Sequence, residues 1–181
     1  MNSRKVARLA LLSAISLILG LIESRLPPLL WFAPYVRLGL ANVVALFAIF
    51  TDGAKVGCFV LTIKCVLVSL LSGNPVALIY SLTAGLISYW IQYALIRYLL
   101  GKISVITVAF IGAAAHNFTQ LIIAALIVGV DLTSLAVLFL PASAVAGLFT
   151  GTVTYLLVKR LPVSLLKDEK TNHGGDANER F

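Results

Sequence analysis

The sequence predicts an all-α integral membrane protein with six transmembrane helices. Its composition is too apolar for a soluble domain. Of 181 residues, 60% are hydrophobic and 12% are charged, and the mean hydropathy is +1.02, whereas soluble domains carry about 25% charged residues. Apolar runs near the roughly 20 residues that a helix needs to cross a bilayer recur along the chain. We therefore expect residues 1–160 to form one transmembrane domain and residues 161–181 a polar, disordered tail.

The first three expected helices cover residues 6–22, 38–50 and 54–71. The first has a basic start and no evident small-residue cleavage site before "ESRLPP", so we interpret it as a helix rather than as a signal peptide. The second is the shortest and follows the proline-rich stretch "RLPPLLWFAP". The turn "TDG" separates the second helix from the third, and such short joins place neighbouring helices antiparallel.

The last three expected helices cover residues 75–99, 103–128 and 132–158. They follow "SGNP", "LLGK" and "GVD", respectively, and these stretches contain the Gly, Pro, Asn and Asp residues that are typical of turns. The sixth helix contains Pro141, which is expected to kink it.

The basic residues predict that both termini lie in the cytoplasm. Lys and Arg accumulate in cytoplasmic loops, and eleven of them fall on one side of the expected bundle, whereas only Arg25 and Arg37 fall on the other. The net charge of +7 is then explained by topology and by attraction to anionic lipid headgroups, so nucleic-acid binding is not required. The eleven are Arg4, Lys5, Arg8, Lys55, Arg97, Lys102, Lys159, Arg160, Lys167, Lys170 and Arg180.

One cation, Lys64, lies inside the apolar run "VLTIKCVLVSLL" of the third expected helix. A charge at the centre of a bilayer costs about 2.5–3.5 kcal/mol on insertion scales, so something should offset it. In one interpretation its stem extends toward the interface or its amine pairs with a polar neighbour, which fixes helix packing. In the other it faces an inner cavity and binds an anionic solute.

Further polar side chains occur at similar depth. The stretch "AAAHNFTQ" places His116 and Gln120 one turn apart on one helix face, with Asn117 offset by about 100°. Asn42 lies in the second expected helix and Tyr80 near the outer end of the fourth. Unsatisfied polar groups are costly in lipid, so we expect these side chains to converge on the bundle interior. Hydrogen bonds between helices and contacts to a ligand are both open to them.

Acidic residues are absent from the expected spans, because Glu23, Asp52 and Asp131 all fall at helix ends. A proton- or sodium-coupled carrier commonly uses an intramembrane acid, which argues against a standalone secondary carrier. The chain has no "GxxxxGK[ST]" phosphate loop, so it is not itself an ATPase. It also has no Asp-rich motif that would hold magnesium against a diphosphate, so neither an enzyme nor a metal site is predicted.

Small residues in the first expected helix favour a close helix contact. Ala10 and Ala14 are four residues apart in "ALLSA", and this spacing lets two helices approach each other in a membrane. The contact is either internal packing or the docking of a partner.

Several stretches taken together resemble a known family. They are "LALLSAISLILGLIES", "VRLGLANVVALFAIF", "LVSLLSG", "YSLTAGLIS" and "AAAHNFTQL". They are similar to the membrane proteins labelled heptaprenyl diphosphate synthase component I, also called the Gx transporter family, over approximately residues 5–160. That family resembles the substrate-binding S components of energy-coupling factor (ECF) transporters.

The resemblance implies a six-helix, S-component-like bundle in the plasma membrane of a prokaryote, which binds a vitamin-like or isoprenoid- or quinone-related, anionic micronutrient. It implies as partners a transmembrane coupling subunit and two cytoplasmic ATPases, which use ATP. No cofactor is expected on this chain itself. Ala10 and Ala14 match the Ala-xxx-Ala motif by which S components meet the coupling subunit.

The expected ligand site lies in the outer half of the bundle. The loop "ESRLPPLLWFAPYVR" would form a lid in which Arg37 contacts the anion and Trp31 gives aromatic cover, although an interfacial aromatic belt explains Trp31 equally well. Two rival functions remain: a non-catalytic membrane partner of a polyprenyl diphosphate synthase, and a standalone secondary carrier. The expected ligand-binding residues are Lys64, His116, Asn117, Gln120, Asn42, Tyr80, Arg37 and Trp31.

Overall fold

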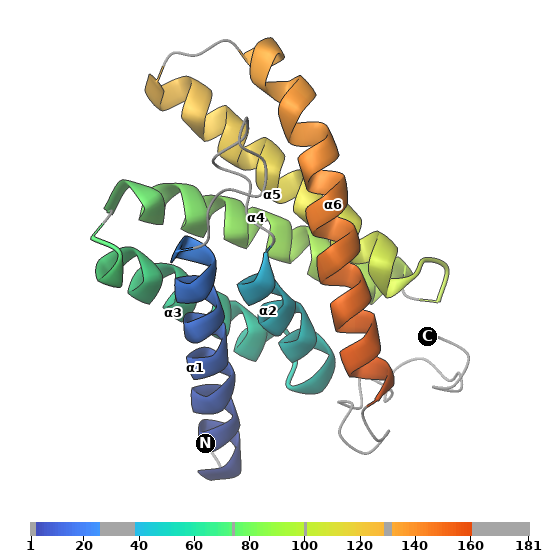
Figure 1. Cartoon of the computed structure of the whole chain (residues 1–181). Coiled ribbons are helices and arrows are strands. Elements are labelled where there is room, and N and C mark those ends of the chain that lie inside the picture. The colour runs from blue at the N-terminus through green and yellow to red at the C-terminus, as the bar shows by residue number, and fades with distance from the viewer. Residues whose placement is uncertain (1–2, 26–38, 74, 100, 129–131, 161–181) are drawn as a thin grey trace.

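All regular structure in the described residues is helical, which confirms the all-α prediction. The computed structural model describes residues 3–25, 39–73, 75–99, 101–128 and 132–160. The helices follow one another in the predicted order (Figure 1). They are α1 (Ser3–Arg25), α2 (Leu40–Thr51), α3 (Ala54–Leu71), α4 (Pro75–Leu99), α5 (Val105–Val128) and α6 (Leu132–Lys159).

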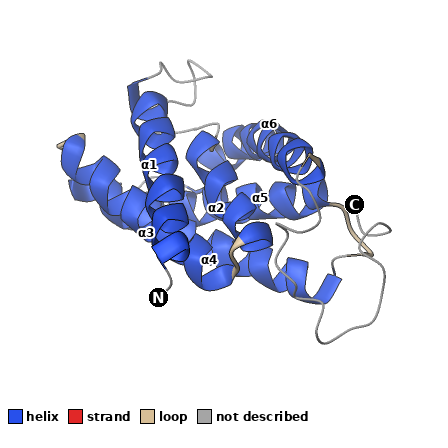
Figure 2. Cartoon of the chain, turned by 90° about the horizontal axis from the view of Figure 1, so that it is seen from below, coloured by secondary structure: helices blue, strands red, loops and turns tan. Residues whose placement is uncertain are grey.

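The short helix α2 lies at the centre of the bundle. It packs against α1, α3 and α6, and the view from below shows it enclosed by the other helices (Figure 2). Nine of its twelve residues are buried, among them Leu46, Ala48 and Ile49. A helix that is apolar on every side is typical of a bundle interior, so the composition of "LANVVALFAIFT" explains its position.

A tight turn connects α2 to α3. The backbone N–H groups of Asp52 and Gly53 both donate to the carbonyl oxygen of Ala48, at 2.9 Å each. Gly53 has a φ angle of 90°, a backbone conformation that residues other than glycine rarely adopt. Asp52 also accepts from the hydroxyl of Thr51 and pairs with Arg8 of α1 at 3.1 Å. The turn therefore holds the first three helices together at this end.

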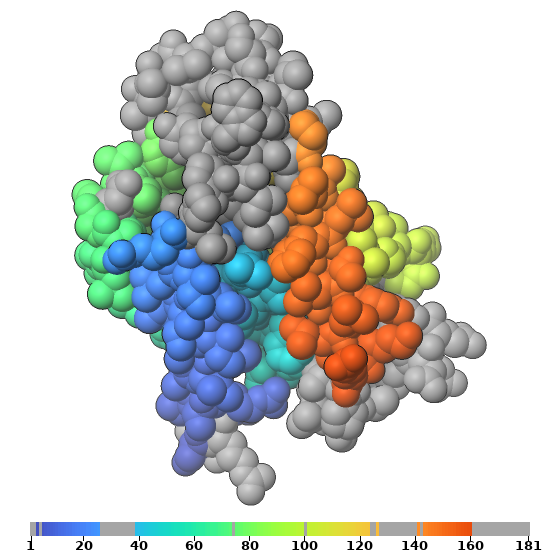
Figure 3. Space-filling view, in the orientation of Figure 1, coloured from blue at the N-terminus to red at the C-terminus, as the bar shows by residue number. Residues whose placement is uncertain are grey.

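On the face that Figure 3 shows, part of α2 (cyan) is visible between α1 (blue) and α6 (orange). The outer face of α1 is apolar and exposed, with Leu11, Ile15 and Ile18 at 61, 41 and 56% exposure. Soluble monomers rarely expose large contiguous apolar surfaces. This face therefore fits contact with lipid or with another protein.

Four helical segments in the described part of the chain are long and apolar enough to cross a membrane: Lys5–Arg25, Ala54–Leu71, Pro75–Leu99 and Val105–Ile123. Two apolar segments, Leu40–Thr51 and Ser143–Lys159, are shorter. At 1.5 Å per residue, α2 extends about 18 Å, less than the roughly 30 Å of hydrocarbon in a bilayer. Six spans with cytoplasmic termini thus stay a prediction, and residues 161–181 lie outside the described residues.

Helices α5 and α6 approach each other through glycines. A Cβ atom added at Gly147 would lie 2.7 Å from the Cα of Phe110, and one added at Gly151 would lie 2.8 Å from the Cα of Ile106. The two backbones therefore nearly touch, as they do where small residues four apart mediate packing between membrane helices.

We expect Gly151→Leu to destabilise the bundle, because the new side chain would meet the backbone of α5. Overpacking of this kind costs about 1–3 kcal/mol. The measurement is the thermal unfolding midpoint in detergent. Thr152→Leu is the matched control, because Thr152 is the next residue and is exposed. Equal midpoints for the two variants would contradict the close approach of α5 and α6.

Candidate functional site

A cavity of about 60 Å³ lies between α1, α2, α3, α4 and α5. Its lining residues come from the last turns of α1, the start of α2, the second half of α3, the start of α4 and the second half of α5. It is therefore near one end of the bundle, where α1, α3 and α5 end and α2 and α4 begin. On this scale one water needs about 10–15 Å³, so the cavity accommodates several water-sized groups.

Lys64 lines this cavity from α3. Its Nζ atom donates a hydrogen bond to the Oδ1 atom of Asn42 on α2, at 3.1 Å. Asn42 lines the same cavity. The lysine thus has the polar neighbour that one interpretation of the sequence expects and the adjacent space that the other expects.

Helix α5 contributes the three polar side chains expected from its sequence. His116, Asn117 and Gln120 all line the cavity. Asn117 is buried, and its Nδ2 atom donates to the hydroxyl of Ser143 on α6 at 2.9 Å. Asn117 therefore joins two helices as well as lining the cavity, so packing and ligand roles do not exclude each other here.

Glu23 also lines the cavity, and sequence reasoning missed it. We expected the first helix to end at residue 22, which leaves Glu23 at a helix end, whereas α1 continues to Arg25. An Oε1 atom of Glu23 accepts a hydrogen bond from the backbone N–H of Gly39, which has φ 76° just before α2. The sequence does contain a signal that could have identified Glu23. It lies three residues after Gly20, and residues at that spacing share a helix face.

Gly20 allows α1 to approach α3 beside the cavity. A Cβ atom added at Gly20 would lie 2.9 Å from Cγ2 of Val68 and 3.4 Å from Cδ of Lys64. The apolar stem of Lys64 thus packs against α1, while its amine reaches the cavity wall at Asn42. This arrangement directs the charged end of the side chain away from the outer surface.

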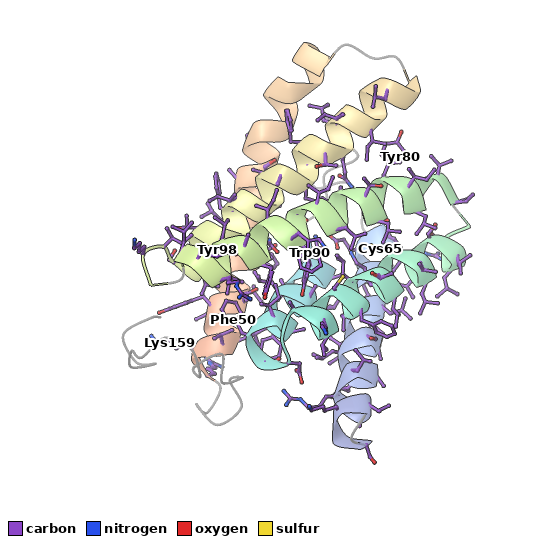
Figure 4. The ribbon with its side chains drawn as sticks, turned by 180° about the vertical axis from the view of Figure 1, so that it is seen from behind. Phe50, Cys65, Tyr80, Trp90, Tyr98 and Lys159 are labelled. Carbon is purple, nitrogen blue, oxygen red and sulfur yellow. The ribbon has the colours of Figure 1, made fainter. Side chains whose placement is uncertain are left out.

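Small polar residues of α3 and α4 complete the lining. Ser69 and Ser72 contribute from the end of α3 and Ser81 from α4. The expected residue Tyr80 is not among the residues that line this cavity, although its neighbour Ser81 is. In Figure 4, Tyr80 and Cys65 lie on opposite sides of α4, and the thiol of Cys65 donates to the carbonyl oxygen of Ser81 at 3.5 Å.

The remaining predicted residues fall into two groups. Arg37 and Trp31 lie outside the described residues, as does the part of the expected lid loop that follows Arg25. Ala10 and Ala14 lie on α1 with exposed side chains. Within the described ranges, no three His, Cys, Asp or Glu residues gather closely enough to hold a metal ion.

A family model matches residues 12–161, a range that includes every lining residue of the cavity. The chain belongs to the heptaprenyl diphosphate synthase component I family. The match confirms the family expected from the sequence stretches. It leaves out Ala10 but includes Ala14, and it ends where the tail begins. No curated protein matches the sequence. The family description refers to one component of a synthase and so implies at least a second component.

We expect the contact between Lys64 and Asn42 to show as energetic coupling. Asn42→Leu removes the partner of the amine, which should lower the free energy of unfolding by about 1–3 kcal/mol. Adding Lys64→Met should then cost less than it does alone, with a coupling of about 0.5–3 kcal/mol. Denaturant titration in detergent measures all four proteins.

The matched control for this cycle combines Asn42→Leu with Lys55→Met, because Lys55 is exposed at the start of α3. These two effects should add. If the effects at positions 42 and 64 add in the same way, the hydrogen bond contributes nothing to stability.

Proposed function

We propose that this chain is the substrate-binding membrane subunit of an ECF-type, ATP-driven importer. The observation that carries the proposal is the cavity between α1, α2, α3, α4 and α5, which is lined by Lys64, by Glu23 and by residues with neutral hydrogen-bonding groups. The ligand is a small vitamin-like or isoprenoid- or quinone-related micronutrient with an anionic group. The site recognises it without chemical conversion.

The chemistry of the lining supports recognition of an anionic group. A lysine ammonium offers three donors, and one of those on Lys64 is used by Asn42. A hydrogen bond in which the donor or the acceptor is charged is roughly twice as strong as one between two neutral groups. Amide groups of Asn117 and Gln120 and the hydroxyls of Ser69 and Ser81 border the same space and add orientation.

The energy for import is assigned to partners. Because the chain carries no phosphate loop, we assign ATP hydrolysis to two cytoplasmic ATPases and propose that this chain binds no cofactor. We place the docking of the transmembrane coupling subunit at Ala10 and Ala14, whose side chains are exposed on α1. Small side chains at this spacing allow a second helix to approach the backbone closely.

The family description favours a second candidate function. A chain of the component I family would act as a non-catalytic membrane partner of a polyprenyl diphosphate synthase. In that case the cavity would hold the polar end of a lipid product, and α1 would contact a soluble prenyltransferase. Both candidates need a partner protein, and the nature of that partner distinguishes them.

We expect Lys64→Met to lose the small molecule that the purified protein retains. A charged hydrogen bond contributes about 1.5–3 kcal/mol, which corresponds to a drop in affinity of about 10- to 100-fold. Mass spectrometry of small molecules extracted from equal amounts of protein measures the loss. Lys55→Met is the control, because it removes an exposed lysine from the same helix. If the two variants retain equal amounts of the small molecule, Lys64 does not contribute to its binding.

Ala14→Trp should abolish co-purification with the partner, because the indole keeps a second helix away from α1. The tagged chain is isolated from its native membranes, and bound proteins are identified by mass spectrometry. An ATPase with a coupling subunit supports the importer, and a soluble prenyltransferase supports the synthase partner. Ile15→Trp is the control, because Ile15 is an exposed apolar neighbour on another part of the α1 surface. A partner that survives Ala14→Trp does not dock at this motif.

A further inference from the structure

Two opposite charges line the cavity. Lys64 contributes an ammonium from α3 and Glu23 contributes a carboxylate from α1. No salt bridge joins these two residues of the described part of the chain, whereas Arg8 and Asp52 form one near the other end of α1. The cavity therefore presents both signs of charge to whatever occupies it.

Each charge is held in place by a neutral group near the start of α2. The amine of Lys64 donates to the Oδ1 atom of Asn42, and the carboxylate of Glu23 accepts from the backbone N–H of Gly39. An ammonium has three donors and a carboxylate has about four acceptor positions, so both groups keep capacity for a ligand. The two charged groups are therefore anchored to different residues, Asn42 and Gly39.

The stem of Lys64 and the backbone of Glu23 lie at different levels along α1. The stem of Lys64 packs beside Gly20, and Glu23 is three residues further along the same helix. At 1.5 Å per residue, Glu23 begins about 4.5 Å farther along α1 than Gly20. The backbone of Glu23 thus lies nearer the C-terminal end of α1 than the level at which the lysine stem packs against this helix.

A ligand that carries only negative charge gains little from this pair. Lys64 attracts it, but Glu23 repels it, so the two interactions oppose each other. A ligand that carries an ammonium as well as an anionic group gains from both residues. The cavity volume of about 60 Å³ has room for several water-sized groups, so it accommodates two small polar groups joined by a short chain.

We propose that the cavity recognises a small zwitterion, whose anionic group binds Lys64 and whose ammonium group binds Glu23. This inference rests on the proposed binding function and narrows its substrate class. The same chemistry occurs in a free ω-amino acid and in the headgroup of a zwitterionic lipid. Native mass spectrometry of the purified protein separates these two sources by the mass of the bound species.

The test uses the full-length purified protein with glycine, β-alanine and γ-aminobutyrate as probes of increasing charge separation. Each probe is compared with the fatty acid and the alkylamine in which a methyl group replaces one charge. Binding is measured by isothermal titration calorimetry. At least one ω-amino acid should bind with an affinity at least about tenfold higher than that of either singly charged analogue. This is the effect of one favourable charged contact.

Two variants assign the preference to the two residues. Glu23→Gln keeps an oxygen that accepts from Gly39 but removes the charge, so the ω-amino acid and its fatty acid analogue should then bind equally. Lys64→Met should equalise the ω-amino acid and the alkylamine. Asp52→Asn is the control, because it removes an acidic charge that is not among the lining residues, and it should leave the preference unchanged. The elution profile and the thermal midpoint show whether each variant is folded.

Other outcomes overturn the inference, and they do so in distinguishable ways. If the fatty acids bind as tightly as the ω-amino acids and binding still needs Lys64, the zwitterion class is wrong but the anion-binding function stands. If no ω-amino acid binds and Lys64→Met also retains the native small molecule, both the inference and the proposed function fail.

Discussion

An ammonium group inside an apolar bundle needs polar neighbours, and this requirement explains much of the arrangement around Lys64. Asn42 accepts a hydrogen bond from its amine, and Asn42 belongs to α2, the short and largely buried helix at the centre of the bundle. The packing of α2 against α3 thus does two things at once. It buries the apolar residues of α2, and it brings an amide oxygen to the lysine.

Much of the surface of α1 is exposed. Its outer face is apolar and exposed, and its contacts with the bundle include polar links at both ends: Arg8 with Asp52, and Glu23 with Gly39. The first is partly exposed, with Arg8 at 44%, so it contributes at most about 1 kcal/mol. Elements with few buried apolar contacts open most easily. A ligand that touches Glu23 would therefore act directly on the position of α1.

The family match indicates the assembly to which the chain is related, and the cavity indicates what kind of molecule it can hold. The matched range covers most of the chain, and the cavity lies entirely within it. The family description concerns a synthase assembly, whereas the lining is a set of hydrogen-bonding groups suited to holding a small polar molecule. A membrane component that binds such a molecule is compatible with either partner, because the cavity lies at one end of the bundle while Ala10 and Ala14 lie on the outer surface of α1.

The sequence by itself determined the helices, because hydropathy and turn residues are local properties. The expected bounds of α3 and α4 agree with the structure at both ends. It also singled out five of the residues that line the cavity, because unsatisfied polar groups are costly in lipid and favour the bundle interior. They are Asn42, Lys64, His116, Asn117 and Gln120. Only the tertiary structure decided which face of each helix turns inward. One residue rotates the side chain by about 100°, so Ser81 rather than Tyr80 lines the cavity. Contacts between helices bring Lys64 to Asn42 and place Glu23 at the same cavity. No local sequence pattern specifies such contacts.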